Sequence, residues 1–542
     1  MKILLIDPAR RDDTWTFPPM SLLLVSMAAR AAGHEAEIID VPYLLEKFPE
    51  KYSLLDNSIF DYILSKDCDI LGLSGHVTTY FFYDAFIRKY RTMKKDIPIV
   101  VGHSVGEPNM EIWEKHNPVD YLVEGHGEVV VQRLLDALEK KDYEAVRKIP
   151  GLHYFKDGHY HRNPVEHISD IDSIPYLDYD EVDVEYYIEG LSKWLVDVIP
   201  GNEGWVKPRT WEDVVLPGSL LTKEKARFLP LLTNRGCPYD CTFCFHAQTK
   251  MHYNSIDYVI GNIKYLRKKY GVNAIMIQDD MFVVDPKRTI ELCEKLYQEN
   301  LGIALFVSGG KPNLVTNEVL ASMRRAGVIR FSYGIETGSQ DMLNIMQKKS
   351  KVDQNKVVLE NTEKNGIASW ANICFGMPGE NRKTISATRD FMINNELTTK
   401  RFYNSWATAY PGSILYDEVK QKGLIKDARE YILKIGSTER VVLNFSDLPD
   451  NELYRRVFEL RREVDMAYLL KIKEYRKYFF KLLEIILAKF IFMLSEKKRE
   501  SVKLFVRKIR LKNMNRGVKR SNEDIEKFAS LQMDLLKKGG LE

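Results

Sequence analysis

Cysteine is scarce in this sequence. The chain has only six cysteines in 542 residues, too few for a scaffold stapled by disulfides. It also has no run of 18 uncharged apolar residues, which argues against a transmembrane helix. The start, MKILLID, lacks the cleavage site of a secretory signal. We therefore expect a cytoplasmic protein, in which clustered thiols bind metal or do redox chemistry.

The length and the charge distribution indicate several parts. Hydrophobic residues make up 45% of the chain and charged residues 29%, which is typical of a folded protein. The net charge is +3, yet residues 471–520 contain 17 Lys and Arg against 4 Asp and Glu. We predict an N-terminal domain (1–145), a joining segment (146–228), a barrel domain (229–430) and a helical, basic C-terminal domain (431–542).

Short apolar runs alternate with helical stretches in the first 145 residues. This alternation predicts a doubly wound parallel sheet, an α/β fold with helices on both faces. The expected strands are KILLID (2–7), EAEIID (35–40), DILGLS (69–74), IPIVVG (97–102) and DYLVEG (120–125).

Small and polar residues stand where these strands end. Ligands of such sheets bind at the carboxyl ends of the strands, and glycine there lets a ligand approach the backbone. A scaffold with ordinary glycine turns remains an alternative. No G-x-G-x-x-G opens the first helix, which disfavours a dinucleotide. The residues at the strand ends are Asp7, Ser74, Gly75, His76, Gly102, His103, Glu124, Gly125, His126 and Gly127.

Most of residues 1–135 resemble the cobalamin-binding domain found ahead of many radical S-adenosylmethionine (SAM) enzymes. The resemblance lies in FPPMSLLLVSMAARAAGHEAEIID, DILGLS, IPIVVGH and DYLVEGHGE. It implies that cobalamin contacts Ser74, Gly75, Gly102, His103, Glu124 and Gly125.

The sequence departs from that family in two places. The D-x-H-x-x-G motif, whose His ligates cobalt, is absent, because DPARRD (7–12) has no His. This implies cobalamin without a His ligand from that motif. Gly102-His103 stands where the family usually has Gly-Gly, after the fourth strand. The His103 side chain is expected to narrow the cleft there. Taken singly, His76, His103 and His126 are interpreted as ordinary histidines at strand ends.

The joining segment, residues 146–228, shows no clean periodicity and is rich in Tyr, Asp, Pro and Trp. We predict a small hairpin followed by an extended wrap, because long inserts of this kind often line a site. HYHRNP has two His at i and i+2, which fits one face of a hairpin better than a metal site.

Six strand–helix units follow residue 228. They predict an open, partial (βα) barrel with six strands, whose chemistry sits at the carboxyl ends of the strands. The strands are LPLLTN, NAIMIQDD, IALFVS, IRFSYGIE, SWANICFG and RFYNSWATAY.

RGCPYDCTFCFH (235–246) follows the first of these strands and carries three of the six cysteines. A zinc site would need a fourth ligand, for which His246 is the candidate, but zinc ligands usually come as two separated pairs. Three core cysteines would have mainly apolar neighbours, whereas Pro, Asp and Thr stand between these. An iron–sulfur cluster fits better, because three thiolates would leave one iron open to another ligand.

The spacing C-x-x-x-C-x-x-C, with Phe243 before the last Cys, resembles the signature of the radical SAM superfamily, over roughly residues 228–425. The resemblance implies that Cys237, Cys241 and Cys244 hold a [4Fe–4S] cluster, whose fourth iron binds SAM. It also implies SAM contacts at Phe243, Glu336, Gly376, Tyr410 and Asp279 or Asp280. The isolated Cys68, Cys293 and Cys374 are predicted to be core residues.

The chain beyond about residue 430 is predicted to be helical. In residues 478–494 the three charged side chains fall on one stripe of a broad apolar helix. Two interpretations of this helix are possible. It packs on the barrel, or it lies at a membrane surface that the chain contacts through residues 471–520. No nucleic acid is expected, because no known nucleic-acid module accompanies the charge.

Together, the two resemblances imply a cobalamin-dependent radical SAM methyltransferase that acts on an unactivated carbon or phosphorus centre. A radical SAM cyclase, oxidase or rearrangement enzyme of the same architecture is one alternative. A non-catalytic regulator that binds cobalamin or zinc is another. The expected partners are a small-molecule, peptide or lipid substrate and an electron donor such as flavodoxin or ferredoxin.

Overall fold

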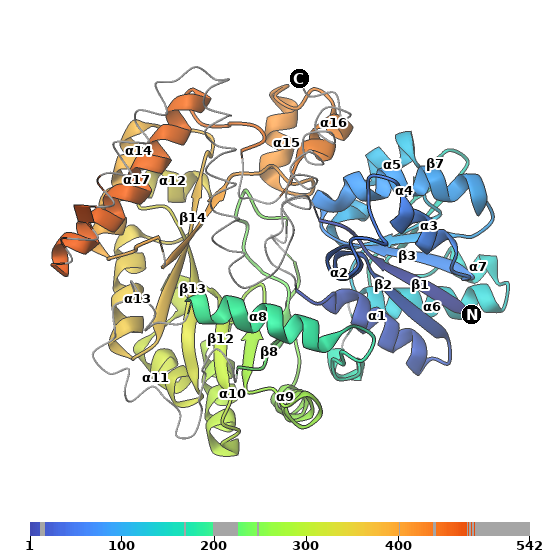
Figure 1. Ribbon diagram of the computed structural model, residues 1–542, viewed down its shortest axis with the longest axis horizontal. Helices are drawn as coiled ribbons and strands as arrows, with labels where there is room; N and C mark the ends of the chain where they lie inside the picture. The colour runs from blue at the N-terminus through green and yellow to red at the C-terminus, as the bar shows by residue number, and fades with distance from the viewer. Residues whose placement is uncertain are drawn as a thin grey trace.

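Two sheets, one from each half of the chain, organise the fold (Figure 1). They are seen in a computed structural model, and each is covered by helices. The structure describes residues 1–10, 17–166, 168, 170–198, 226–245, 249–399, 401–436, 441–473, 475, 478, 479 and 482.

The first sheet has the strand order β2-β1-β3-β4-β5-β6-β7. Its first five strands are parallel, which confirms the predicted doubly wound sheet. The predicted hairpin of the joining segment is present as β6 (Leu152–Lys156) and β7 (His159–His161), and it extends this sheet in antiparallel fashion. The parallel strands are β1 (Lys2–Asp7), β2 (Glu35–Asp40), β3 (Ile70–Ser74), β4 (Ile99–Gly102) and β5 (Tyr121–Val123).

Alternate residues of β1 serve two different cores, as the two-residue period of a strand requires. Leu4 and Ile6 pack with α3 (Ser58–Leu64), α4 (Tyr80–Met93) and α5 (Met110–His116) on one face. Ile3 and Leu5 pack with α1 (Met20–Ala31) and α6 (Gly127–Glu139) on the other. The chain therefore buries both faces of the sheet, so that the open edge at the strand ends is left for a ligand.

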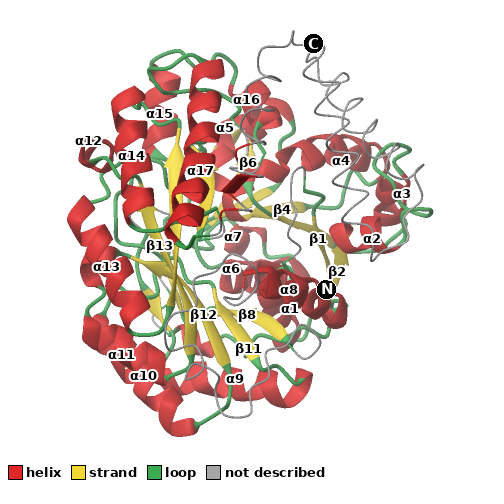
Figure 2. Ribbon diagram, turned by 60° about the vertical axis from the view of Figure 1, so that its left-hand side comes forward, coloured by secondary structure: helices red, strands yellow, loops and turns green. Residues whose placement is uncertain are grey.

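The second sheet has the order β15-β14-β13-β12-β11-β8, with every neighbouring pair parallel. This confirms six strands of a partial barrel, with β8 and β15 at its two edges. The helices that connect the strands lie on the outer side (Figure 2). The strands are β8 (Phe228–Leu231), β11 (Ala274–Ile277), β12 (Ala304–Gly310), β13 (Val328–Glu336), β14 (Ala368–Phe375) and β15 (Phe402–Trp406).

The barrel strands also alternate. On β11, Ile275 and Ile277 pack toward the helices, in the largest core cluster, whereas Ala274 and Met276 belong to a smaller cluster on the other face. The helices between the strands are α9 (Ile256–Tyr270), α10 (Pro286–Glu299), α11 (Asn317–Arg325), α12 (Gln340–Ile345), α13 (Val352–Lys364) and α14 (Arg382–Asn394).

The described part of the C-terminal region is helical, as predicted. From residue 431 on it contains the end of α16 (Ala428–Lys434) and all of α17 (Asp450–Lys471), which packs on α14. The preceding α15 (Ile414–Gln421) lies within the predicted barrel domain. No helix in the described ranges is long and apolar enough to cross a membrane. Almost all of the basic stretch 471–520 lies outside the described residues. The two interpretations of it, packing on the barrel and contact with a membrane surface, therefore stay predictions.

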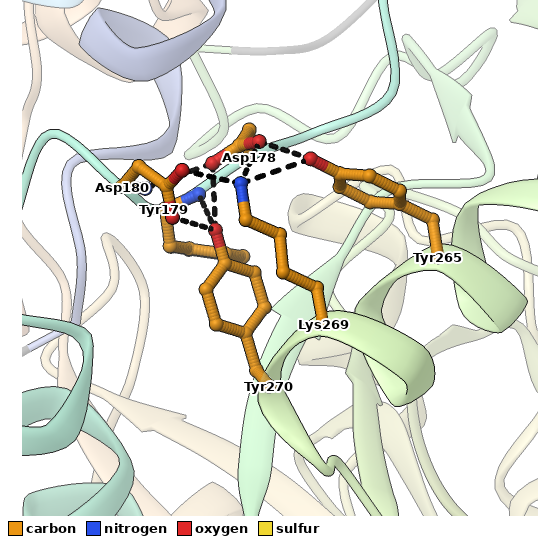
Figure 3. Close-up of polar contacts among 6 residues, drawn as sticks. All are labelled: Asp178, Tyr179, Asp180, Tyr265, Lys269 and Tyr270. Atoms are coloured by element: carbon orange, nitrogen blue, oxygen red, sulfur yellow. Dashed lines mark hydrogen bonds and ion pairs between the residues drawn. The ribbon is translucent and has the colours of Figure 1, made fainter.

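A polar clamp fastens the joining segment to the barrel (Figure 3). Lys269, on α9, lies 2.6 Å from Asp178 and also pairs with Asp180. The Tyr270 hydroxyl is 2.6 Å from Asp178 and 2.9 Å from Asp180, and Tyr265 also donates to Asp178. Burial alone would raise the pKa of Asp178, but Lys269 and the two tyrosines outweigh it and lower this pKa to about 2.

The same segment also holds the first domain. Glu181 accepts a hydrogen bond of 2.6 Å from the Ser26 hydroxyl and pairs with Arg30 at 3.2 Å, both on α1. Tyr187, on α8 (Val184–Val198), donates to Asp40 at the end of β2. Because the joining segment makes hydrogen bonds and ion pairs with both domains, it helps to fix how their strand ends face each other.

Candidate active site

A cavity of about 1150 Å³ opens between the two domains. The first sheet contributes the residues that follow β1, β3, β4 and β5, and the barrel contributes the loop after β8 together with Asp280 and Tyr410. The carboxyl ends of both sets of parallel strands thus face one space, the arrangement that places ligands in α/β folds.

The structure brings all six predicted cobalamin contacts to this cavity. Ser74 ends β3 and Gly75 follows it, Gly102 ends β4 and His103 follows it, and Glu124 and Gly125 follow β5. Each of the six lines the wall. The pairing of Ser74 with Gly102 sets the ends of β3 and β4 side by side.

The cavity extends beyond the strand-end residues that the sequence predicted. It continues below the strand ends between the sheet and α1 and α6, over an apolar floor. Gly72 lies on this floor in the middle of β3, where a Cβ atom would come within 2.5 Å of the Leu5 side chain. A glycine inside a buried strand marks a close approach, so Gly72 was the available signal. The floor is lined by Ile3, Leu5, Leu22, Val25, Val100, Val123 and Val131.

Two imidazoles stand side by side at the ends of β3 and β4. The ring centroids of His76 and His103 are 4.8 Å apart and the rings are nearly perpendicular. Both side chains are exposed and line the cavity. The His76 ring also contacts Phe245, at 6.2 Å between centroids, so this pair reaches the loop that carries the cysteines.

An ion pair with a buried carboxylate joins the two domains beside the cysteine loop. Arg235 lies on β9 (Asn234–Arg235), which pairs with β10 (His252–Tyr253), and its guanidinium is 2.8 Å from Glu128 at the start of α6. Burial would raise the pKa of Glu128, but Arg235 outweighs it and lowers this pKa. The His126 ring stands 4.6 Å from that of His252. Sequence reasoning missed this cluster, because no spacing pattern links β9 to β10.

The three clustered cysteines are half-buried free thiols, whereas Cys68, Cys293 and Cys374 are buried in the cores, as predicted. The loop is held at its start, where Cys237 donates its backbone N–H to Thr249 at 2.7 Å. It is held further along by Thr242, which donates to the Met346 carbonyl at 3.1 Å. Burial raises the pKa of the Cys237 thiol.

The donor set of this loop fits a cluster with three protein ligands. Three thiols, Cys237, Cys241 and Cys244, come from one loop, and none is packed in a core. In the part of the chain that is described, no three His, Cys, Asp or Glu side chains form a site for a single metal ion. His246, the candidate fourth ligand of a zinc site, lies outside the described residues.

Glu336 stands at the end of β13 in a left-handed conformation, with φ +64°. Such a backbone is costly for a residue other than glycine, and it often marks a functional position. Its carboxylate is 2.8 Å from the ammonium of the half-buried Lys348. Burial would lower the pKa of Lys348, but Glu336 outweighs it and raises this pKa. The ammonium also lies 5.9 Å from the Phe243 ring, within the cysteine loop.

The two predicted aspartates have different surroundings. Asp279 is buried and accepts hydrogen bonds from the Thr233 backbone at 2.7 Å and the Asn234 side chain at 2.9 Å. Burial raises the pKa of Asp279 to about 6. Asp280 lines the cavity and accepts a hydrogen bond of 3.2 Å from the Gly236 backbone. The geometry therefore favours Asp280 for a ligand contact and gives Asp279 a structural role.

The remaining predicted SAM contacts come from the last strands of the barrel. Gly376 follows β14 with φ +88°, and its N–H donates to Glu380. Burial raises the pKa of Glu380 to about 8. Tyr410 follows β15 and lines the cavity, where its ring centroid is 6.1 Å from that of Phe245. Phe245 is a cavity residue that sequence reasoning missed.

The sequence family described as the Radical SAM superfamily matches residues 231–392. This range begins within β8 and contains the cysteine loop and most of the barrel. This part of the chain is therefore a radical SAM domain, whose cofactors are a [4Fe–4S] cluster and SAM.

Comparison of whole chains narrows the class. An uncharacterized methyltransferase of Pyrococcus horikoshii is 26% identical over 431 residues, covering 77% of this chain and 83% of that protein. The anaerobic magnesium-protoporphyrin IX monomethyl ester cyclase of Rubrivivax gelatinosus is 24% identical, covering 88% and 81%.

A solved structure shares the fold of both domains. The radical SAM methyltransferase TsrM from Kitasatospora setae, with cobalamin and a [4Fe–4S] cluster bound, superposes with a TM-score of 0.60 at 17% identity, over 78% of each chain. The chain thus combines a barrel domain that matches the Radical SAM superfamily with an N-terminal domain that shares the fold of TsrM.

Proposed function

We propose that this enzyme is a cobalamin-dependent methyltransferase that modifies an unactivated carbon or phosphorus centre. The observation that carries the proposal is the shared cavity, which is walled by the strand ends of the first domain and by the cysteine loop of the second. A substrate held there would meet a group bound by each domain. Four of the relatives and structures that match this chain, including those from P. horikoshii and K. setae, are named methyltransferases.

The cavity fits a corrinoid in its shape and its lining. Glycines at the strand ends, Gly75, Gly102 and Gly125, let a flat macrocycle approach the backbone. The apolar floor beneath them suits the aromatic nucleotide base of cobalamin, because burial of its apolar surface among aliphatic side chains is favourable. When bound, cobalamin supplies a carrier for a methyl group.

The barrel residues prepare the other half of the site. The cluster and SAM supply the 5′-deoxyadenosyl radical. The three thiolates Cys237, Cys241 and Cys244 would hold the cluster, since they lie on one fixed loop. Asp280 and Tyr410 line the cavity next to that loop and are placed to orient a ligand there. The walls formed by both domains would keep water from a reactive intermediate.

A second candidate is a radical SAM cyclase of the same architecture. The Rubrivivax gelatinosus relative favours it, since that cyclase matches 88% of this chain. Both candidates use the same cavity, so that its geometry does not separate them. Their SAM-derived products do, because only a methyltransferase forms S-adenosylhomocysteine.

Cofactor loading is the first test. The full chain is purified anaerobically, reconstituted with iron, sulfide and hydroxocobalamin, and desalted. We expect a brown protein with about four irons per chain and a corrin spectrum that remains with the protein. A colourless protein that binds zinc, or one that loses all corrin on desalting, would contradict the proposal.

The partners and the location follow from the same proposal. The cluster needs a low-potential electron donor, for which flavodoxin or ferredoxin is suitable. The substrate is a small molecule, a peptide or a lipid. We place the enzyme in the cytoplasm, with the basic stretch 471–520 at an anionic membrane surface. Flotation with anionic and with neutral vesicles tests this, and equal binding to both would count against it.

A further inference from the structure

An imidazole stands where glycine is expected on the cobalamin side of the cavity. His103 follows Gly102 at the end of β4, and its ring lines the cavity beside that of His76. The segment at the end of β1, DPARRD (7–12), has no His and places Asp7 and Arg10 at this wall instead. The two imidazoles at the ends of β3 and β4 therefore offer nitrogen ligands from neighbouring strand ends at the same edge of the sheet.

The His103 ring is oriented in the way typical of metal-binding histidines. Its Nδ1 atom is 3.2 Å from the Gly75 carbonyl oxygen, which follows the neighbouring strand β3. A hydrogen bond to a carbonyl requires the proton on Nδ1 and puts the ring lone pair on Nε2. Histidine ligands usually donate their second nitrogen to such a carbonyl, which fixes the ring and raises its basicity.

The Gly75 carbonyl is itself held in place. It accepts a second hydrogen bond, of 3.1 Å, from the backbone N–H of Val105, which is buried. The carbonyl that orients the His103 ring is thus fixed by the loop that follows His103, and the ring position is set by the backbone of two adjacent strands.

The backbone at His103 is strained. Its φ is +62°, in the left-handed region that glycine adopts freely and other residues adopt at a cost of about 1 kcal/mol. A glycine at this position would avoid that cost. Retaining a side chain here makes sense if the imidazole has a task at the cavity wall.

We infer that His103 provides the axial nitrogen ligand of cobalamin, with Nε2 donating its lone pair to cobalt from the side of the first sheet. The inference rests on the proposed binding of cobalamin. It assigns the ligand to His103 rather than His76, because the His103 ring is fixed by a backbone carbonyl, whereas the His76 ring packs against His103 and Phe245. One coordinate bond forms, and no electron changes hands.

Electron paramagnetic resonance of the cob(II)alamin-loaded full chain tests this directly. An axial ¹⁴N ligand splits the cobalt lines into triplets, and an axial ¹⁵N ligand splits them into doublets. The protein is therefore prepared with natural and with ¹⁵N-labelled histidine. We expect triplets in the first sample and doublets in the second.

Matched variants identify the residue. His103→Gly accepts the same backbone conformation without strain, so it is expected to fold and to lose the doublets of the labelled sample. Added ¹⁵N-imidazole is expected to restore them by entering the vacated space. His126→Ala, which changes another cavity imidazole at the end of β5, is expected to keep the doublets.

Other outcomes overturn the inference. Triplets in both samples would mean that the nucleotide base of cobalamin is the ligand, and an absence of nitrogen splitting would mean water or an open position. If the doublets were lost in His76→Ala but kept in His103→Gly, the ligand would be His76 and the inference for His103 would be wrong. A protein that retains no corrin after desalting would overturn the proposed function as well, whereas each preceding result leaves that function standing.

Discussion

At the scale of single residues, two sets of cysteines have opposite environments. Cys237, Cys241 and Cys244 are half-buried on one loop, whereas Cys68 and Cys293 lie in the cores. A thiolate ligand and a core thiol respond differently to removal, because only the first is bound to iron.

Replacing one loop cysteine is therefore expected to remove the cluster. Cys241→Ala should lower the iron content from about four per chain to a small fraction of that, while the far-ultraviolet circular dichroism stays unchanged. Cys68→Ala, the control, should keep its iron and lose about 1 kcal/mol of stability from the small cavity left behind. Iron analysis after anaerobic reconstitution measures both, and full iron in Cys241→Ala would refute the assignment.

The neighbouring aspartates predict a second contrast. Asp280→Asn should weaken SAM binding about tenfold, because it removes a carboxylate from the cavity wall, and leave the stability nearly unchanged. Asp279→Asn should instead lower the free energy of unfolding by about 1–3 kcal/mol, because it disturbs a buried carboxylate that accepts several hydrogen bonds. Equilibrium dialysis with SAM and urea unfolding separate the two. The reverse pattern would assign the SAM contact to Asp279.

At the scale of elements, the clamp between the joining segment and α9 depends on pH. The pKa of Asp178 is lowered from 3.8 to about 2 in the folded protein. A carboxyl group with a lowered folded pKa stabilises the protein above its unfolded pKa, and the stabilisation is lost as pH falls from about 4 toward 2. Because this carboxylate is partly exposed, the contribution is about 1 kcal/mol rather than the full value of the shift.

Lys269→Met tests the clamp, since it removes the cation that Asp178 and Asp180 share. We expect the variant to lose about 1 kcal/mol at pH 7 and to show a weaker loss of stability between pH 4 and 2. Lys268→Met, its exposed neighbour on α9, is the matched control and should follow the parent protein. Urea unfolding at several pH values measures this, and parallel curves for both variants would rule the clamp out.

Much of the fold was predictable because its strands are strongly apolar. The residues of β1 and β11 are buried on both faces of their sheets. Strands of this kind are continuous apolar segments, which can be recognised in a sequence. The edge that bears the cavity was predictable for the same reason, since Ser74 and Gly102 are the last residues of neighbouring strands in one parallel sheet. The hairpin of β6 and β7 was predicted, but the sequence carries no pattern that reveals its pairing with β5.

The parts of the site that escaped prediction depend on contacts between distant segments. Arg235 and Glu128 meet only because the domains dock, and β10 reaches β9 across the cysteine loop. Neighbours in sequence were equally hard to separate: Asp279 and Asp280 follow the same strand, and only the packing shows which of them is buried.

At the scale of the whole molecule, the two domains have to be held in one orientation. The ion pair between Arg235 and Glu128 lies at their junction, where the carboxylate is buried and the guanidinium is partly exposed. Breaking a buried pair leaves one uncompensated charge, which costs about 3–5 kcal/mol, whereas replacing both members by apolar residues is often nearly neutral.

Arg235→Met should therefore destabilise the protein strongly, and Arg235→Met combined with Glu128→Leu should recover most of the loss. Urea unfolding of the two single variants and the double variant gives the coupling. Small-angle scattering would show whether the domains separate in the single variants. Additive losses in the double variant would show that the pair does not act as a unit across the junction.

The central claim is that one cavity brings a methyl carrier and a radical source to one substrate. S-adenosylhomocysteine and 5′-deoxyadenosine, measured after anaerobic incubation of the reconstituted enzyme with SAM and reductant, with and without cobalamin, test it most directly. The account predicts that cleavage to 5′-deoxyadenosine requires the cluster and that S-adenosylhomocysteine forms only when cobalamin is also bound. If the fully loaded enzyme gave 5′-deoxyadenosine and no S-adenosylhomocysteine, methyl transfer would be contradicted.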